Sequence, residues 1–344
     1  MTTKFNRRQA LTTGVVSLGL AASIGGREAM AGPLTDVWGQ DFLKQWSPPE
    51  NLKRDLTPGT SPIRLSRSRL TYAENIDFSA AVKAIRDEGY TACEANPRNF
   101  RGITDSQIRE MQAALKQHDV EFYGFHIVVN IIDPDESKAQ ANRKQVAQAV
   151  ELADRMGLKH VLTHTGGRDP KRKDQPHPDN WTRETWNMSV NAIKQILRDT
   201  SGSKIPLAIE AVNSCNNNTP QSHVRLKEDV GDPRVKVTLD PTNMLDPGLV
   251  YRTTELINLC FDLLGDDICY CHCKDVQWNG MLPALEWVIP GTGLMDYETY
   301  LIRMSRLKEP RPLYIEFLPK DQYPIAKKNI EDIAKKVGVT IYGS

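Results

Sequence analysis

The segment Ile268–Val276 combines a short apolar run with three side chains that could do chemistry. Turn-forming residues stand on both sides of it, so the segment is predicted to be a buried strand. At its end come His272, Lys274 and Asp275, which supply an imidazole, an ammonium and a carboxylate. Such a group at the end of a buried strand indicates a site, provided that other segments bring partners to it.

Carboxylates also mark the ends of three other predicted strands, at Glu210, Asp240 and Glu316. A single acidic residue after a strand is more often a helix N-cap or a solvated loop residue, but these stand in register on successive strands. Gathered in one apolar pocket they would repel one another and raise their pKa values, and a divalent cation removes that conflict. Oxygen ligands with one imidazole suit Mn²⁺, Mg²⁺, Co²⁺ or Zn²⁺. We therefore predict a metal site formed by Glu210, Asp240, His272 and Glu316.

Further polar residues stand at or just after the strand ends, where they could bind the hydroxyl groups of a substrate. The alternative for His126 and His164 is a buried histidine with satisfied hydrogen bonds, and Lys274 could instead pair with Asp275. The other histidines are interpreted as surface or loop residues, namely His118, His160, His177 and His223. The predicted substrate-binding residues are Glu94, His126, His164, Asn213, Asn243, Lys274 and Asp275.

The segments that carry these residues alternate between strand and helix. Eight strand–helix pairs over about 280 residues predict parallel strands with right-handed crossovers. We therefore predict an α/β fold, a single-domain (β/α)8 TIM barrel, in which chemistry gathers at the carboxyl ends of the strands. An open doubly wound sheet is the alternative, although no Gly-x-Gly-x-x-Gly motif follows the first strand. The predicted strands are 63–70, 90–95, 120–130, 160–164, 206–212, 235–239, 268–273 and 313–317, and the predicted helices are 78–88, 105–117, 136–156, 180–198, 221–230, 253–264, 297–307 and 323–337.

Three of the six cysteines, Cys269, Cys271 and Cys273, lie within the central segment. The two-residue period of a strand puts these three on one face, and His272 and Lys274 on the other. Neighbours on one strand cannot adopt the usual disulfide geometry. We predict buried free thiols in a packing layer rather than metal ligands or disulfides.

The amino-terminal residues predict an export signal. Arg7 and Arg8 precede an apolar run, 15–24, that is too short to span a bilayer, and Ala29-Met30-Ala31 is a small-x-small cleavage pattern. A polar first helix of the mature fold is the alternative. The predicted organisation is a twin-arginine signal peptide at 1–31, an irregular arm at 32–62, and the barrel domain at 63–344, with the mature protein in the periplasm.

Composition argues against several classes of partner. Lys and Arg number 44 against 43 Asp and Glu, a net charge of +1, which gives no electrostatic case for nucleic acid or an anionic membrane. Hydrophobic residues at 40% and charged residues at 25% are ordinary for a soluble protein. No cysteine lies near the cleavage pattern, so a lipid anchor at that point is not predicted. A small-molecule partner is predicted, and a homo-oligomer is left open.

Five short motifs follow one another in a specific order. They are Ile209-Glu210, Leu239-Asp240-Pro241-Thr242-Asn243, His272-Cys273-Lys274-Asp275-Val276, Pro290-Gly291-Thr292-Gly293 with Asp296-Tyr297, and Ile315-Glu316. In this order the sequence resembles the sugar phosphate isomerase/epimerase superfamily, the xylose isomerase-like barrels, over residues 63–339. The resemblance implies a TIM barrel and places the family's metal ligands on Glu210, Asp240, His272 and Glu316.

The resemblance also implies an activity. Ketose 3-epimerases of this superfamily use two metal-bound glutamates as an acid/base pair, which would be Glu210 and Glu316 in this sequence. A metal that chelates a carbonyl and a neighbouring hydroxyl acidifies the C–H bond between them, so a carboxylate can take the proton. The implied function is a metal-dependent isomerase or epimerase of a free sugar or keto-sugar, acting through an enediolate, with Mn²⁺ as the first choice of metal.

Departures from the family pattern leave other functions open. The 3-epimerases have a histidine three residues after the strand-six aspartate, where this chain has Asn243. The same site could serve a lyase or dehydratase of a 3-keto sugar, an inosose or a 3-keto-glycoside, and a non-catalytic sugar-binding barrel is a third interpretation. DNA repair, as in endonuclease IV, is disfavoured by the seven histidines and the near-neutral charge. The basic loop 168–173 could recruit a phosphate or a carboxylate, or be a solvated loop.

Overall fold

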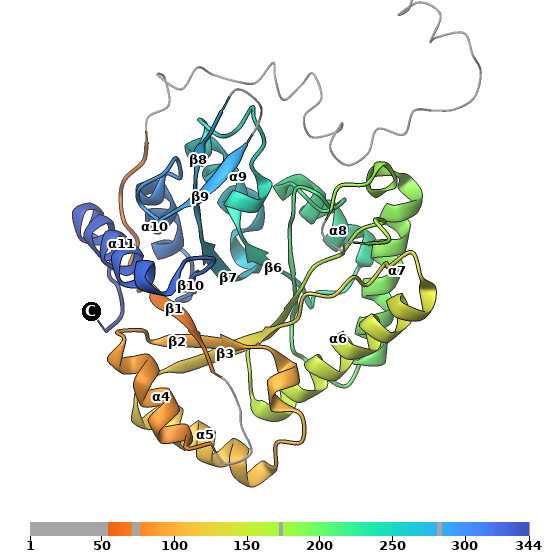
Figure 1. Ribbon diagram of the computed structural model, residues 1–344, viewed down its shortest axis with the longest axis horizontal. Coiled ribbons are helices and arrows are strands. Elements are labelled where there is room, and N and C mark those ends of the chain that lie inside the picture. The colour runs from red at the N-terminus through yellow and green to blue at the C-terminus, as the bar shows by residue number, and fades with distance from the viewer. Residues whose placement is uncertain (1–53, 71–75, 172–174, 281–283, 344) are drawn as a thin grey trace, which may run out of the picture. The chain divides into compact units, whose positions relative to one another are not determined.

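The chain forms a closed parallel barrel surrounded by helices (Figure 1). This computed structural model describes residues 54–70, 76–171, 175–280 and 284–343. The strand order is β1-β10-β7-β6-β5-β4-β3-β2, and β1 closes the ring against β10. The predicted TIM barrel is confirmed, and the open doubly wound sheet is excluded. The barrel strands are β1 (Arg64–Arg69), β2 (Ala92–Ala95), β3 (Glu121–His126), β4 (His160–Thr163), β5 (Leu207–Glu210), β6 (Val235–Leu239), β7 (Ile268–Cys273) and β10 (Pro312–Ile315).

A helix follows each barrel strand, and sequence signals explain where the helices begin and end. Asp135 caps α6 by accepting a hydrogen bond from the Ser137 N–H, and Gly157, with a φ of 70°, ends it in the left-handed conformation. Thr104 and Gln107 form a capping box at the start of α5. The helices are α4 (Phe78–Asp87), α5 (Asp105–Gln117), α6 (Glu136–Met156), α7 (Arg183–Asp199), α8 (Pro220–Val230), α9 (Thr253–Leu264), α10 (Tyr297–Ser305) and α11 (Tyr323–Val337), with short 3-10 helices η2 (Pro97–Phe100), η3 (Pro178–Trp181), η4 (Pro241–Met244), η5 (Gly265–Asp267) and η6 (Lys320–Gln322).

A hairpin that was not predicted follows β7. Its strands β8 (Asp275–Trp278) and β9 (Leu285–Val288) pair antiparallel as a separate two-stranded sheet before α10 (Figure 1). The predicted strand 268–273 is confirmed as β7, and the last residues of the central segment, Asp275 and Val276, belong to the hairpin instead. The last barrel strand is shorter than predicted, so that Glu316 stands just beyond its end.

The inside of the barrel is filled by aromatic side chains beneath the strand ends. Tyr123, Tyr270 and Tyr314 are all buried there, and the Tyr270 hydroxyl donates a hydrogen bond of 2.8 Å to Ser66 Oγ. Tyr270 precedes His272 by two residues on β7, so both side chains point inward. This aromatic layer forms the floor on which the polar residues at the strand ends rest.

Two histidines expected at the surface or in loops are buried instead. His160 is 1% exposed, and its ring centroid lies 5.2 Å from that of Tyr270 inside the barrel. Gly124 on β3 makes room for it, since a Cβ there would come within 2.8 Å of His160 Nε2. The prediction of a surface or loop position for His160 was wrong. His160 and His164 are four residues apart, an even separation along a strand, so both side chains point into the barrel. His223, in the first turn of α8, is also 1% exposed.

Two of the three cysteines of β7, Cys271 and Cys273, are buried as predicted, whereas Cys269 is only partly buried. All six cysteines of the chain are free thiols. Cys271 and Cys273 are fully buried on the outer side of the strand, and Cys273 Sγ lies 3.3 Å from the Tyr297 hydroxyl on α10. Burial raises the pKa of Cys271 to about 12, so its thiol stays protonated at neutral pH.

Residues 54–62 run along the end of α10 without forming a helix or strand. The Gly59 N–H donates a 2.8 Å hydrogen bond to Ser305 Oγ, and a Cβ at Gly59 would come within 2.1 Å of the Ser305 carbonyl oxygen. The predicted signal peptide and residues 32–53 of the predicted arm lie outside the described residues. Within the described part of the chain, no helix is long and apolar enough to cross a membrane.

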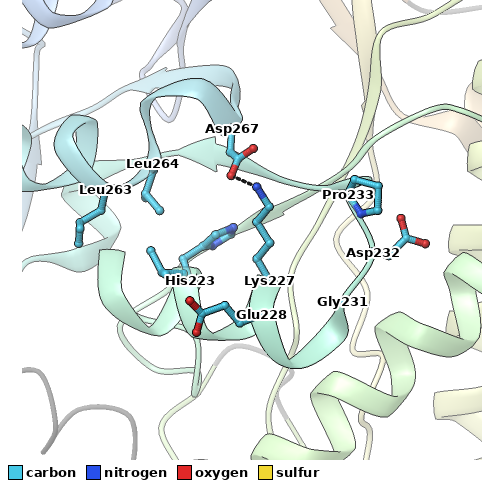
Figure 2. A pocket seen from close by; sticks show the side chains of 10 residues that line it. His223, Lys227, Glu228, Gly231, Asp232, Pro233, Leu263, Leu264 and Asp267 are labelled. Carbon is cyan, nitrogen blue, oxygen red and sulfur yellow. Dashed lines mark hydrogen bonds and ion pairs between the residues drawn. The ribbon is translucent and has the colours of Figure 1, made fainter.

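A surface pocket of about 440 Å³ lies between α8 and α9 (Figure 2). Lys227 of α8 and Asp267, just before β7, line it and form an ion pair. Lys236 of β6 pairs with the same carboxylate. The lining residues belong to the helix ends and strand starts, so the pocket lies at the amino end of the barrel, opposite to the predicted site.

Asp267 is expected to make the stability of the protein depend on pH. Burial alone would raise its pKa, but Lys227 and Lys236 lower it below the usual value. The ionised carboxylate therefore stabilises the fold above the unfolded-state pKa of about 3.9, and this contribution is lost as the pH falls through the folded-state pKa. Because the carboxylate is partly exposed, we expect Asp267→Asn to lower the free energy of unfolding by only about 1 kcal/mol at pH 7, and by less at pH 3. Urea unfolding at both pH values measures this, and equal losses would contradict it.

Candidate metal centre

The four predicted metal ligands come from four adjacent barrel strands. Glu210 is the last residue of β5, Asp240 follows β6, His272 lies in β7 and Glu316 follows β10. These strands are neighbours in the barrel, so their carboxyl ends meet at one rim. All four residues are buried, none of them more than 3% exposed.

The distances between these side chains match those of ligands around one ion. His272 Nδ1 lies 2.7 Å from Glu316 Oε1, 3.0 Å from Glu210 Oε1 and 3.6 Å from Asp240 Oδ2. One ligand atom each from Glu210, Asp240 and His272 lies within 4.8 Å of the others. Metal–ligand distances of about 2.1 Å leave adjacent ligand atoms about 3 Å apart. The spacing therefore makes Glu210, Asp240 and His272 a candidate divalent-metal site, with Glu316 beside it.

Lys274 places an ammonium among the same carboxylates. Its Nζ lies 2.5 Å from Asp240 Oδ2, 2.9 Å from Glu316 Oε1 and 3.9 Å from Glu210 Oε1. The residue is 4% exposed, so these ion pairs are shielded from water. Lys274 does not pair with Asp275, which was the alternative considered from the sequence.

The balance of charge and hydrogen bonds fits a bound cation. Three carboxylates face one ammonium, which leaves an excess of negative charge in a buried site. Asp240 Oδ2 and both Glu316 oxygens have no aligned hydrogen-bond donor among the described residues, although Lys274 Nζ is near. Lys274 and His272 pair with Asp240 Oδ2 and Glu316 Oε1 by charge, and Glu316 Oε2 remains without a hydrogen bond among the described residues. A divalent ion would ligate these buried oxygens and so lower the cost of burying them.

Charge pairing shifts the pKa values of the site in opposite directions. Burial would raise the pKa of Glu210, but His272 and His164 hold it well below its usual range. Burial likewise opposes ionisation of Glu316, whose pKa is nevertheless lowered to about 2 by His272 and Lys274. Burial would lower the pKa of His272 and Lys274, whereas the carboxylates raise both. Without a metal ion the two glutamates are therefore ionised at neutral pH and His272 is protonated, so a metal ion that bound here would displace the proton of His272.

Asp240 serves two purposes with its two oxygens. Its Oδ1 accepts hydrogen bonds from the backbone N–H groups of Thr242, at 3.1 Å, and Asn243, at 3.3 Å, and so caps η4. Its Oδ2 is left to face His272 and Lys274. The N-cap, considered from the sequence as an alternative to a site role, thus coexists with it and fixes the direction of the carboxylate.

Glu210 is held by two residues that were predicted to bind substrate. Asn243 Nδ2 donates a 2.9 Å hydrogen bond to Glu210 Oε1, and His164 Nε2 lies 2.7 Å from Glu210 Oε2. Both therefore orient a carboxylate of the centre. Asn213 lies further out, where its backbone N–H donates to the Asn243 carbonyl at 2.8 Å, and it ties the β5 loop to the β6 loop.

Glu94 and His126 form a second polar pair across the barrel mouth. His126 Nδ1 lies 3.1 Å from Glu94 Oε1, and the His126 ring centroid is 6.0 Å from that of His272. Glu94 is 1% exposed, whereas the His126 side chain is 12% exposed. The pair therefore borders the metal centre and presents an imidazole toward the mouth.

Asp275 lies apart from the centre and organises the loop before α10. Its Oδ1 accepts from the N–H groups of Val276 and Met295, at 2.9 and 3.0 Å, and its Oδ2 from Gly291 and Gly293, at 3.0 and 2.9 Å. Gly293 is needed for this contact, since a Cβ there would come within 2.3 Å of Asp275 Oδ1. The shared motifs His-x-Lys-Asp and Pro-Gly-Thr-Gly are thus two halves of one structural unit.

Substituting Asp275 by asparagine is expected to destabilise the barrel. The amide NH₂ would face one of the two pairs of backbone donors, so two buried N–H groups would lose their acceptor. We expect the free energy of unfolding to fall by about 2–3 kcal/mol in urea titrations. The control is Asp332→Asn, at an exposed ion pair with Lys328, where a loss below about 0.5 kcal/mol is expected. Equal effects at the two positions would contradict this role.

The basic loop 168–173 is anchored at its start. The Arg168 guanidinium donates a 2.6 Å hydrogen bond to the Ile132 carbonyl, and its backbone N–H donates to Asn180 Oδ1 at 2.7 Å. Residues 172–173 lie outside the described residues. Arg168 therefore joins the loops after β3 and β4, and anion binding by this loop remains a prediction.

Two tyrosines of α10 hold the strand ends and were not predicted from the sequence. The Tyr300 hydroxyl donates to the carbonyls of Leu239 and His272, at 3.2 and 3.1 Å, and the Tyr297 hydroxyl donates to the Lys274 carbonyl at 2.7 Å. They tie β6 and β7 together directly behind the ligands. The signal in the sequence was their three-residue spacing, which puts both on the inner face of one helix.

A closed (β/α)8 barrel with acidic residues and a histidine at its strand ends defines a class of TIM barrels that support chemistry with a metal ion. The family model described as xylose isomerase-like TIM barrel matches residues 82–336, and the chain belongs to this family. This finding confirms the resemblance seen in the sequence. A search of curated protein sequences gives no match.

Solved structures share the fold at low sequence identity. The 3-keto-D-glucoside 4-epimerase YcjR from E. coli is 13% identical, with a TM-score of 0.58 over 80% of this chain and 100% of its own. The probable 3-DHS dehydratase AsbF from Bacillus anthracis is 15% identical, with a TM-score of 0.61 over 79% and 99%. A xylose isomerase-like TIM barrel protein from Mycobacterium smegmatis, in complex with magnesium, is 14% identical, with a TM-score of 0.56 over 81% and 97%. These identities establish the fold alone.

Proposed function

We propose that this protein is a metal-dependent isomerase or epimerase of a free sugar or keto-sugar. Glu210, Asp240, His272 and Glu316 would hold the ion, with Mn²⁺ expected and Mg²⁺, Co²⁺ or Zn²⁺ as alternatives. The observation that carries the proposal is the position of two glutamates, whose Oε1 atoms lie 3.0 Å (Glu210) and 2.7 Å (Glu316) from the same His272 nitrogen. Two carboxylates that approach one point from separate strands suit an acid/base pair.

The two glutamates divide the proton transfers between them. A divalent ion held by these residues would polarise a carbonyl oxygen of the substrate and so acidify the neighbouring C–H bond. Glu210 or Glu316 takes that proton, and the substrate becomes an enediolate. The other carboxylate returns a proton to the opposite face, which inverts the carbon, or to the adjacent carbon, which gives the isomer. The atoms balance without an oxidant or a second substrate.

Neighbouring side chains prepare these groups for that task. Asn243 and His164 contact the two oxygens of Glu210 and fix its orientation. Glu94 and His126 are placed to bind hydroxyl groups of the substrate across the mouth. The buried positions exclude water, which strengthens each electrostatic contact.

Lys274 favours an elimination as the second candidate function. Its ammonium lies 2.9 Å from Glu316 Oε1, so it stands beside the proposed base and could stabilise the negative charge of a departing hydroxyl or alkoxide after the C–H proton is removed. The substrate would then be a 3-keto sugar, an inosose or a 3-keto-glycoside, and the product would lack water or an aglycone. The names of two proteins with a similar fold, a 3-keto-D-glucoside epimerase and a probable dehydratase, support testing both reactions.

Metal analysis and solvent-isotope exchange together test the proposal. We expect the purified protein to contain about one divalent ion per chain, and ketoses or 3-keto-glucosides incubated in D₂O to gain deuterium at one carbon. Deuterium at a retained stereocentre identifies an epimerase or isomerase, and loss of water or aglycone identifies a lyase. A metal-free protein that binds sugars without exchange would instead support a non-catalytic sugar-binding barrel.

We further propose that the protein is exported by the twin-arginine route and acts in the periplasm on a small carbohydrate, without nucleic acid or a membrane anchor. The support is the paired arginines and the cleavage pattern before residue 32. Replacing Arg7 and Arg8 by lysine is expected to retain the protein in the cytoplasm, as measured by cell fractionation. Export of the variant at the wild-type level would contradict the proposal.

A further inference from the structure

Two aromatic side chains, Trp287 and Phe317, meet at the mouth of the barrel, and we call them the aromatic pair. Trp287 comes from β9 of the hairpin, and Phe317 directly follows the candidate ligand Glu316. Their ring centroids are 6.1 Å apart, and the rings lie within 28° of parallel. Lys274 Nζ lies over both rings, 4.6 Å from the Phe317 centroid and 5.6 Å from the Trp287 centroid. The pair therefore borders the metal centre, one layer further out.

Both rings are open to solvent although they are large and apolar. Trp287 is 52% exposed and Phe317 is 62% exposed. Single exposed apolar residues are ordinary, but two aromatic rings in contact beside a buried charged site indicate a surface that a ligand covers. The carboxylates are at most 3% exposed, so the exposed aromatic pair offers a contact surface at the edge of a buried charged site.

The backbone at Phe317 is strained in a way that holds its ring at the mouth. Its φ is 58°, in the left-handed region that bulky residues avoid. The other non-glycine residue with a positive φ in the described part of the chain is Asp119, a residue type that tolerates this conformation. Such strain in a bulky residue persists where the surrounding structure enforces it, which happens most often at functional sites.

The other ring of the aromatic pair, Trp287, belongs to the hairpin that follows β7. β8 begins directly after Lys274, and the pairing of Val276 with Trp287 brings the indole back over the site. Asp275 fixes the start of the hairpin through its four backbone contacts. Both rings are thus attached within a few residues of side chains that form the metal centre.

We propose that the aromatic pair is a subsite for a second ring of the substrate, so that the natural substrate is a glycoside rather than a single free sugar. This inference rests on the proposed function for the ring that reacts. Sugar rings present an apolar C–H face, which packs well on an aromatic surface. Lys274 Nζ lies 2.9 Å from Glu316 Oε1 and 4.6 Å from the Phe317 centroid, so the aromatic pair is next to the carboxylates. A substrate whose first ring binds at the candidate metal centre would place its second ring, a sugar or an aglycone, on Trp287 and Phe317.

Calorimetric titration of the full chain with one-ring and two-ring ligands tests the subsite. The probes are glucose, cellobiose, maltose, sucrose and phenyl β-D-glucoside, each with Mn²⁺ and again with EDTA. We expect at least one two-ring probe to bind about tenfold more tightly than glucose, and Trp287→Thr or Phe317→Asn to remove that advantage. Threonine suits a strand and asparagine tolerates positive φ, so both variants should fold.

A control and a second measurement separate this inference from the proposed function. Leu263→Ala removes an apolar side chain, 42% exposed, at the amino end of the barrel, and should leave every affinity unchanged. Equal binding of one-ring and two-ring probes, no binding of any two-ring probe, or unaltered affinity in both aromatic variants would overturn the subsite. Absence of deuterium exchange in the wild-type protein would overturn the proposed function alone, since calorimetry reports the subsite independently.

Discussion

Replacing Glu316 by glutamine is expected to lower kcat by about a thousandfold or more while the barrel remains folded. The amide cannot take a proton from carbon, and as a neutral group it is a weaker metal ligand. The side chain keeps its shape, so its packing at the end of β10 should survive. Turnover of the substrate found in the D₂O screen measures the loss, and circular dichroism with thermal unfolding confirms the fold.

Glu210→Gln, at the end of β5, is the matching variant and should lose activity to a similar extent. If the two glutamates act on opposite faces of the substrate, each variant should still exchange one proton with solvent at a reduced rate, without completing the inversion. The control is Glu151→Gln, an exposed residue of α6, whose kcat should equal that of the wild type. A Glu316→Gln enzyme with more than about a tenth of wild-type kcat would rule out an acid/base role for this residue.

Replacing Lys274 by methionine is expected to destabilise the metal-free protein by about 3–5 kcal/mol. The ammonium lies within 3.9 Å of all three carboxylates, and without it their charges face one another in a buried site. Methionine retains most of the side-chain volume, so loss of charge is the main change. Urea unfolding in EDTA measures the effect.

Addition of Mn²⁺ should recover much of the stability lost in Lys274→Met, because the ion supplies positive charge to the same carboxylates. The matched control is Lys328→Met, at an exposed ion pair on α11, where a change below about 0.5 kcal/mol is expected in either condition. If Mn²⁺ stabilised Lys274→Met no more than it stabilised the wild type, the ion and the ammonium would not share these carboxylates.

The architecture of the barrel could be predicted from the sequence because local signals and the tertiary fold agree. The helices α5, α6, α9 and α11 have the predicted bounds, and capping residues or a terminal glycine mark many helix ends. Strand ends could also be recognised, because in a parallel barrel a polar residue after a short apolar run indicates the carboxyl end of a strand. That register alone was enough to bring Glu210, Asp240, His272 and Glu316 to one rim.

The sequence could not show which side chains from segments far apart in the chain contact one another. Lys274 was expected near substrate, but its position between Asp240 and Glu316 depends on the relative heights of three strands. Asp275 was expected in the same role, and its contacts with the 291–295 backbone depend on how a long loop folds back. The hairpin was missed because its strands are only four residues each, too short for a periodic pattern to distinguish them from loop.

The separate pairing of the hairpin has a practical consequence. Its two strands hydrogen-bond to each other as a sheet of their own, while the eight barrel strands close without them. Changes in the hairpin could therefore alter which ligands bind at the mouth while the pairing of the barrel strands that carry Glu210 and Glu316 is kept. The same modularity makes the segment between Gln277 and Glu286 a natural place for grafted loops in the redesign of this barrel.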